Sequence, residues 1–308
     1  NQRELVLITT NRGALPLVVN LVANLAHLGH HHALIVADAP ATCHLLSSAS
    51  RRPACIYSQL LNKLYSRAFR FYKGVLPVWK LWLQRYIYFL RAMRLGLNPL
   101  LIDADVILYH DPYPHLKSVL ANHTLVALSD ESAGYAHVNG GIWYAQGAHR
   151  DGPSVGIFAD FERRVISMLA AAEHPPETII RVTQGANRGR PASDLLYDQA
   201  LINDVLFSTL VGRDVSYASG TKLDAYPNAI AGAGRFWRPG SHEMPTPPSL
   251  PSWGGSYTPR AARLRERTLT RGGVSETLLL APAWLFDAES NSEGRRHAEA
   301  WGAAQPPI

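Results

Sequence analysis

The chain has 308 residues, of which 47% are hydrophobic and 18% are charged, and its formal net charge is +6. A chain of this length and hydrophobicity buries one large core or two small ones. Its lysines and arginines are scattered and do not form one basic stripe between aromatic residues, so the charge does not favour a nucleic-acid-binding protein. The positive balance suits a diphosphate-bearing substrate or an acidic polysaccharide.

The start of the chain and its two cysteines are informative about membrane anchoring and the redox compartment. No run of about eighteen apolar residues is present to cross a membrane, and no signal peptide is found. The abrupt start at Asn1 is typical of an excised catalytic domain, so a membrane anchor is expected only outside this chain. Cys43 and Cys55 either form one disulfide in an oxidising compartment or remain two free thiols, and the sequence leaves both possibilities open.

In the first hundred residues, the spacing of apolar residues predicts strands that alternate with helices. The pattern predicts buried strands at 4–9, 32–37 and 100–102. It predicts helices with one apolar face at 17–28 and 78–95, each followed by a glycine. This order favours a parallel sheet with flanking helices. Later segments predict strands at 124–128 and 277–280, helices at 158–171 and 194–206, and an irregular loop at 231–259.

The most informative feature is the segment LLIDADVIL at 100–108. Asp103 and Asp105 follow the apolar residues of a buried strand and are separated by one residue. Two unpaired carboxylates at this point repel each other and lose hydration, so a cation is expected between them. Mg²⁺ and Mn²⁺ prefer carboxylate and phosphate oxygens, and the pattern is typical of a glycosyltransferase that uses a nucleotide sugar. The alternative is a surface turn with two solvated aspartates.

Polar residues also follow two other predicted parallel strands. Thr9 and Asp38 end the first and second strands, as Asp103 ends the third. Ligands of such sheets collect beyond the carboxyl ends of the strands. The three residues therefore predict a binding site at one edge of the sheet.

Several blocks in order resemble a known family. They are Asp103-Ala104-Asp105-Val106 with Asp111-Pro112, then Asn139-Gly140-Gly141, and then Asp198-Gln199-Ala200-Leu201-Ile202-Asn203. These blocks resemble the plant and algal nucleotide-diphospho-sugar transferases of glycosyltransferase family 77. That family includes xylosyltransferases acting on pectin and arabinosyltransferases acting on extensin-type glycoproteins. The resemblance covers most of residues 4–206 and is weaker over 208–274.

The resemblance implies an α/β fold of the GT-A (Rossmann-like) type, with a mainly parallel central sheet, flanking helices and a single domain over residues 1–308. It implies transfer of a sugar of the xylose, arabinose or galactose class from a UDP-sugar to a cell-wall polysaccharide or glycoprotein, with retention of configuration. Mn²⁺ or Mg²⁺ is the implied cofactor. The implied setting is the Golgi lumen, as the catalytic domain of a type II membrane protein.

The resemblance also assigns a metal and diphosphate region. Asp103 and Asp105, with Ala104 between them, match the residues that hold the metal and the donor. Lys80 and Arg85 lie on the helix before this strand, where a cation meets the diphosphate or an acidic side chain. Lys80 is the candidate for the diphosphate, and a solvated helix face is the alternative for both.

The nucleotide is expected at the first two strands. Thr9, Thr10 and Asn11 match the loop that cradles the nucleotide, although such residues are also ordinary turn formers. Asp38 matches a residue that contacts the base or the ribose.

The transferred sugar is expected at the two later blocks. Asn139, Gly140 and Gly141 are expected to form a turn whose backbone lines the sugar pocket, the alternative being a hairpin turn without a ligand. Asp198 and Gln199 are the expected carboxylate and amide beside the sugar, although an aspartate near a helix start is also favoured by the helix dipole. We expect the acceptor to attack from the face of the leaving group, without a covalent glycosyl-enzyme.

The chain departs from the family pattern near its end. Ser129 and Asp130 match a pair on the acceptor side, but the late histidine that completes the metal site has no clear match. His242 and His297 are weak substitutes, and we expect the histidine beyond Ile308. A non-catalytic nucleotide-sugar-binding domain is therefore one alternative function. An Asp-x-Asp phosphohydrolase is another, although its motif normally lies on the first strand.

Overall fold

The computed structural model of the chain describes residues 3–47, 53–59, 77–129, 138–171, 198–211 and 265–281. The strands in these ranges are β1 Glu4–Thr10, β2 Ala33–Ala37, β3 Ala54–Tyr57, β4 Asn98–Ile102, β5 Leu125–Ser129, β6 Val138–Ala145, β7 Arg265–Arg271 and β8 Val274–Ala281. The helices are α1 Leu15–His27, α2 Pro40–Ser47, α4 Pro77–Arg94, α5 Tyr113–Ser118, α6 Pro153–Ala171 and α7 Asp198–Val211, with a 3₁₀ turn, η1, at Arg12–Ala14.

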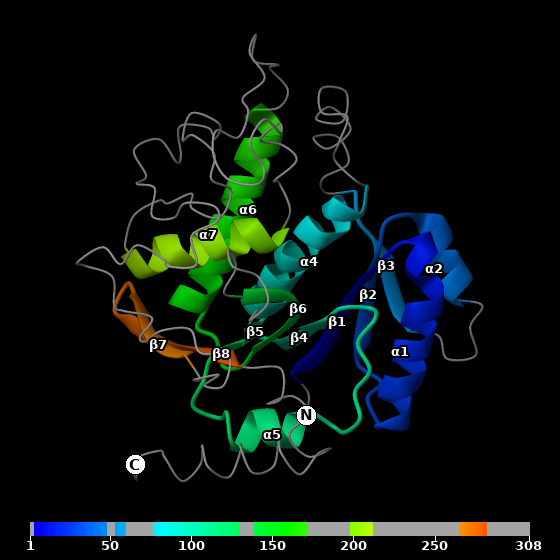
Figure 1. Cartoon of the computed structure of the whole chain (residues 1–308), viewed down its shortest axis with the longest axis horizontal. Coiled ribbons are helices and arrows are strands. Elements are labelled where there is room, and N and C mark those ends of the chain that lie inside the picture. Colours follow the sequence, from blue (N-terminus) through cyan, green and yellow to red (C-terminus); the bar gives the residue numbers. More distant parts are fainter. Residues whose placement is uncertain are drawn as a thin grey trace, which may run out of the picture.

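The strands of the described ranges form one sheet in the order β3-β2-β1-β4-β6-β5-β8-β7 (Figure 1). The pairs β3–β2, β2–β1, β1–β4 and β5–β8 are parallel, whereas β6 is antiparallel to both of its neighbours and β7 is antiparallel to β8. The predicted α/β fold class is confirmed, and the strand before Asp103 lies in the middle of the sheet as expected. Whether all 308 residues form one domain stays a prediction.

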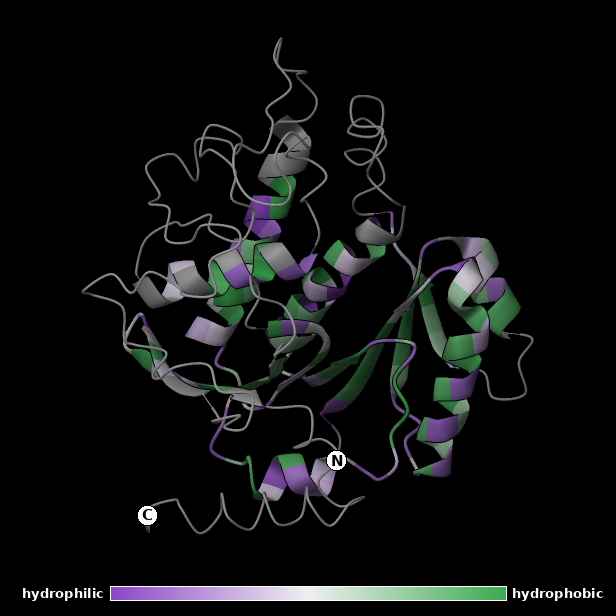
Figure 2. Ribbon diagram, in the orientation of Figure 1, coloured by the Kyte–Doolittle hydropathy of each residue, from purple (hydrophilic) through white to green (hydrophobic). Residues whose placement is uncertain are grey.

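Helices cover both faces of the sheet. One buried cluster lies under α4, α6 and α7, and the other lies under α1, α2 and α5 (Figure 1). Figure 2 shows largely hydrophobic strands between helices that alternate hydrophobic and hydrophilic residues. This is the pattern expected of helices that bury one stripe against a sheet. No helix among the described residues combines the length and the hydrophobicity needed to cross a membrane.

Helix α4 is the element that positions the site. It was predicted at 78–95 and is found at Pro77–Arg94. Its Tyr86 and Phe89 are buried and pack on the aromatic rings of α6, with ring centroids 4.8 Å apart in both the Tyr86–Phe161 and the Phe89–Phe158 pairs. This packing fixes the rotation of α4, and so it fixes where Arg85 points.

The predicted turn at Asn139-Gly140-Gly141 is wrong, because these residues lie inside strand β6. Asn-Gly is a strong local turn signal. Here the residues instead continue a ladder in which Ile142 pairs with Ile102 of β4. The predicted loop at 231–259, together with Asp130, His242 and His297, lies outside the described residues.

Candidate functional site

The carboxyl ends of β1, β2 and β4 lie at one edge of the sheet. Thr10 pairs with Ala37, the last residue of β2, and the Asp38 amide donates a hydrogen bond to the Thr10 carbonyl at 3.0 Å. Leu7 of β1 pairs with Leu101 of β4, two residues before Asp103. The structure therefore brings Thr9, Asp38 and Asp103 to the same edge, as the sequence predicts.

Arg85 joins the segment after β4 to helix α7. Its guanidinium donates from Nη1 to Asp103 Oδ1 and from Nη2 to Asp198 Oδ2. Arg85 is only 3% exposed and Asp198 only 2%, whereas the Asp103 side chain is 35% exposed. A single buried cation thus holds together carboxylates from two sequence blocks that are 95 residues apart along the chain.

The charges of this cluster depend on one another. Burial raises the pKa of the Asp198 carboxyl above its ordinary value, and the Arg85 guanidinium acts against that rise. Burial acts to lower the pKa of Arg85, but Asp198, Tyr86 and Asp103 outweigh it and raise that pKa further. Arg85 therefore stays protonated, and its charge opposes the rise that burial causes in the pKa of Asp198.

The glycines of β6 make room for this cluster. A Cβ atom on Gly140 would collide with the Arg85 guanidinium and lie 3.2 Å from Asp198 Oδ2. A Cβ atom on Gly141 would lie 2.9 Å from Asn139 Oδ1 and 3.1 Å from Asp103 Oδ2. The sequence predicts close backbone approach at these glycines, and in the structure the approaching groups are side chains of the site.

Backbone contacts fix the strand beside the cluster. The Asp103 amide donates to the Gly141 carbonyl at 2.9 Å, and Asn139 Oδ1 accepts from the Gly141 amide at 2.7 Å. Asn203 of α7 donates to the Gln199 carbonyl at 2.7 Å and exchanges hydrogen bonds of 3.2 Å with both backbone groups of Val138. Asn203 therefore ties the first turns of α7, including Asp198, to the start of β6.

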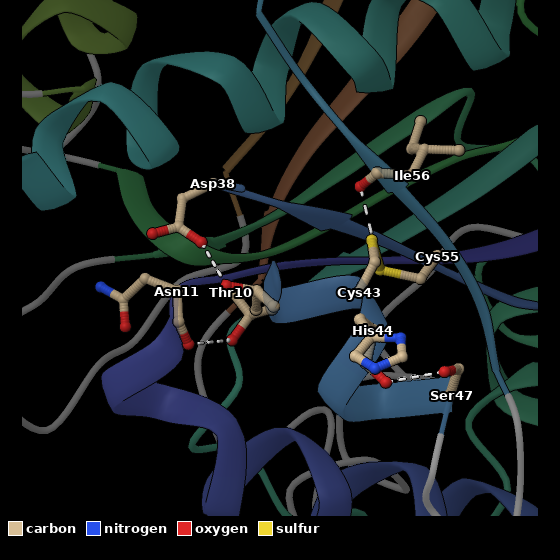
Figure 3. The surroundings of a disulfide bond; sticks show 9 residues. Thr10, Asn11, Asp38, Cys43, His44, Ser47, Cys55 and Ile56 are labelled. Atoms are coloured by element: carbon tan, nitrogen blue, oxygen red, sulfur yellow. Dashed lines mark hydrogen bonds between the residues drawn. A yellow bond between two sulfur atoms is a disulfide. The ribbon is translucent and has the colours of Figure 1, made fainter. Parts of the chain in front are cut away.

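At the nucleotide end, two of the predicted residues serve the loop itself. The Thr10 hydroxyl is buried and donates to the Asn11 carbonyl at 3.1 Å (Figure 3). Asn11 Oδ1 accepts from the Ala14 amide at 3.0 Å. Thr9 and Asp38 are half-buried at the edge. The Asp38 carboxylate accepts from the Thr42 hydroxyl of α2 at 2.7 Å.

Lys80 links the nucleotide end to the Arg85 cluster. It is half-buried on α4, where burial lowers its pKa and the nearby Asp38 carboxylate partly opposes the change. Lys80 and Arg85 are five residues apart on the same helix, which is about 7.5 Å along its axis. Helix α4 therefore supplies one cation near Asp38 and another to the pair of carboxylates at Asp103 and Asp198.

Two carboxylates are available for the predicted metal. Arg85 engages Oδ1 of Asp103, and Asp105 is exposed to solvent. The described residues contain no cluster of three or more His, Cys, Asp or Glu side chains arranged around a common point. Mg²⁺ needs only one or two protein carboxylates when a bound phosphate and waters complete its shell, which is the number that Asp103 and Asp105 offer.

The sequence identified most residues of this cluster but missed how they interact. Asp103, Asn139 and Asp198 were predicted, whereas the double pairing of Arg85 and the role of Asn203 were not. The only signal was that the helix 78–95 precedes the metal strand, which leaves the partner of Arg85 undetermined. A separate cavity of about 600 Å³ lies between α6, α7 and β7, and none of the predicted site residues lines it.

No protein-family model and no curated protein matches the chain. Among solved structures, the glycosyltransferase GlyE of Streptococcus pneumoniae is 13% identical with a TM-score of 0.37, covering 65% of this chain and 42% of that protein. Mouse xyloside xylosyltransferase 1 is 10% identical with a TM-score of 0.35, covering 65% of this chain and 80% of that one. Galactosyltransferase LgtC, solved with donor and acceptor sugar analogues, is 13% identical with a TM-score of 0.30, covering 46% of this chain and 57% of that one. Likenesses this low carry no substrate, metal or reaction over to this chain.

Proposed function

We propose that the protein is a glycosyltransferase that binds a nucleotide-diphosphate sugar along the carboxyl edge of its sheet. The observation that carries the proposal is the buried pairing of Arg85 with both Asp103 and Asp198. This pairing places the strand expected to hold the metal against the helix expected to hold the sugar. The resemblance of the sequence blocks to nucleotide-sugar transferases supports the same function.

The edge offers a region for each part of the donor. Thr9 and Asp38 take the nucleoside at the ends of β1 and β2, and Lys80 attracts the diphosphate from α4. Asp103 and Asp105 hold Mn²⁺ or Mg²⁺, which when bound supplies a Lewis acid that neutralises the leaving diphosphate.

The sugar region lies on the other side of Arg85. Asn139 and Gln199, which are half-buried, contact the transferred sugar, and the glycines of β6 make room for the pair of Arg85 with Asp198. Because Arg85 holds Oδ2 of Asp198, which is buried, this carboxylate is not a free nucleophile. The geometry therefore favours attack on the face of the leaving group.

In that reaction the acceptor hydroxyl oxygen forms a bond to the anomeric carbon on the side from which the nucleotide leaves. The bond from the anomeric carbon to the diphosphate oxygen breaks, and its electron pair goes to that oxygen. The leaving diphosphate accepts the hydroxyl proton. The product keeps the anomeric configuration of the donor.

The donor class that we propose is a UDP-sugar of the xylose, arabinose or galactose type, with a glycan or glycoprotein as acceptor. The Cys43–Cys55 disulfide supports an oxidising compartment, because such bonds persist mainly outside the cytosol. This agrees with the Golgi lumen as the site of action.

The test is UDP binding by calorimetry with and without Mn²⁺, together with a panel of UDP-sugars assayed for metal-dependent transfer and hydrolysis. We expect Asp105→Ala to abolish the Mn²⁺-dependent part of UDP binding and to leave the fold intact, because Asp105 is exposed. Asp151→Ala, at an exposed aspartate outside this edge, is the matched control and should bind as the wild type does.

Three outcomes decide between the candidate functions. Transfer or hydrolysis of a UDP-sugar that requires Mn²⁺ supports the proposal, and the anomer of the product tests retention. UDP binding without turnover of any donor would identify a non-catalytic binding domain. Turnover of para-nitrophenyl phosphate without UDP binding would identify a phosphohydrolase.

A further inference from the structure

The Cys43–Cys55 disulfide lies beside the nucleotide end of the proposed donor site. Cys43 belongs to α2 and Cys55 to β3, the edge strand of the sheet, and the bond joins two segments separated by 12 residues. Figure 3 shows this bond together with Asp38, Thr10 and Asn11. The sequence left the state of the two cysteines open, and the structure shows them bonded.

A short chain of contacts leads from the disulfide to Asp38. Thr42 precedes Cys43 in α2, is 2% exposed, and donates its hydroxyl hydrogen to Asp38 Oδ1 at 2.7 Å. Asp38 in turn donates its backbone amide to the Thr10 carbonyl. The carboxylate of Asp38 is therefore held from one side by α2, while its backbone is held by β1.

The disulfide determines where α2 lies relative to the sheet. Cys55 pairs with Ile35 in the ladder between β3 and β2, so β3 is in register with the strand that directly precedes Asp38. The bond from Cys55 to Cys43 then fixes α2 to that register. Without the bond, packing alone holds α2 against β3, β2 and α1, and the contact of Thr42 with Asp38 loses this covalent support.

We propose that Thr42 positions the Asp38 carboxylate for donor binding and that the Cys43–Cys55 disulfide keeps Thr42 in place, so that reducing this bond weakens donor binding. The proposal rests on the proposed function, because Asp38 is its nucleoside contact. A dithiol reductant supplies the electrons: its two thiols are oxidised to a cyclic disulfide, and Cys43 and Cys55 each gain one electron and one proton to become thiols. The chain has only these two cysteines, so the reductant acts on this bond alone.

The experiment measures the affinity for UDP with Mn²⁺ by calorimetry, using the oxidised and the reduced protein. In the oxidised protein we expect Thr42→Val to weaken UDP binding about tenfold, as for the loss of one hydrogen bond to a charged group. Thr42→Ser keeps the hydroxyl, so its affinity should remain within about twofold of the wild type. Thermal unfolding followed by circular dichroism verifies that each variant is folded.

The coupling between Thr42 and the disulfide is the decisive readout. Reduction should weaken UDP binding by the wild type and by Thr42→Ser, but it should add little to the loss already present in Thr42→Val, because both changes act through Asp38. A general loosening of the fold would instead lower the affinity of all three proteins by the same factor on reduction.

The outcomes separate this proposal from the proposed function. If the oxidised wild type binds UDP and Thr42→Val binds it equally well, the positioning role is wrong and the proposed function stands. Equal losses on reduction in the wild type and Thr42→Val would overturn the coupling. If the oxidised wild type does not bind UDP at all, the proposed function fails and this proposal fails with it.

Discussion

Replacing Arg85 by methionine tests whether its double ion pair organises the site. Methionine keeps an unbranched side chain in the core but removes both hydrogen bonds to Asp103 and Asp198. Asp198 is 2% exposed, so the substitution leaves a buried carboxylate without its counter-charge. The Asp103 side chain is 35% exposed, so water hydrates its carboxylate and partly replaces the lost hydrogen bond.

The expected effect follows from Asp198. Removing one partner of a buried ion pair typically lowers the free energy of unfolding by about 3–5 kcal/mol, because the remaining charge is uncompensated. Adding Asp198→Asn to Arg85→Met removes that charge, so the double variant should be more stable than Arg85→Met alone. Arg85→Lys should also be destabilised, because one ammonium group lacks the two-pronged geometry that reaches both carboxylates.

Urea unfolding monitored by tryptophan fluorescence measures these differences in a double-mutant cycle. The matched control is Arg94→Met on the same helix, where an exposed arginine pairs with Glu162 at 3.6 Å and the loss should stay below about 1 kcal/mol. The reasoning is refuted if Arg85→Met is no more destabilised than Arg94→Met. It is also refuted if adding Asp198→Asn to Arg85→Met lowers the free energy of unfolding by as much as Asp198→Asn lowers that of the wild type.

Three further predictions address the donor edge. UDP affinity should fall as the pH rises through the lowered pKa of Lys80, because the neutral amine no longer attracts the diphosphate. In Lys80→Arg this fall should occur at higher pH, since arginine keeps its charge, and calorimetry from neutral to alkaline pH measures the difference. Gly140→Ala should lower the free energy of unfolding by about 1–3 kcal/mol, since its Cβ collides with Arg85, and an unchanged unfolding midpoint in urea would contradict this. Removal of divalent ions by a chelator should abolish high-affinity UDP binding, and Mn²⁺ in excess should restore it; equal affinity in chelator would exclude a metal at Asp103 and Asp105.

The sequence predicted the elements whose apolar pattern is strong. The structure places the ends of β1, β2, β4 and α4 within two residues of the predicted ends. Continuous runs of apolar residues are typical of buried strands, and apolar residues at helical spacing are typical of helices that pack on a core. Strand β7 was missed, since its sequence RERTLTR is mostly polar and it lies at the edge of the sheet. The short strand β3 was also missed, because three of its four residues are exposed and the fourth, Cys55, is half-buried.

The site was predictable in its members but not in its contacts. Residues at the ends of parallel strands meet by topology, which is why Thr9, Asp38 and Asp103 could be grouped in advance. The partner of Arg85 depends on the rotation of α4, and aromatic packing against α6 sets that rotation. The Asn-Gly turn was predicted wrongly because the local preference of these residues was overridden by the ladder between β4 and β6.

The charges at the carboxyl edge of the sheet bear on the proposed divalent ion. Among the described residues of this edge, the carboxylates are those of Asp38, Asp103, Asp105 and Asp198, and the cations are Arg12, Lys80 and Arg85. Arg85 is committed to two carboxylates, so it cannot also neutralise a diphosphate. The carboxylates therefore outnumber the cations, and a further cation would favour the approach of an anionic nucleotide. In the proposed function, one Mg²⁺ or Mn²⁺ held by Asp103 and Asp105 would supply that cation and bind the phosphate oxygens, so the buried arginine and the metal would serve different parts of the same ligand.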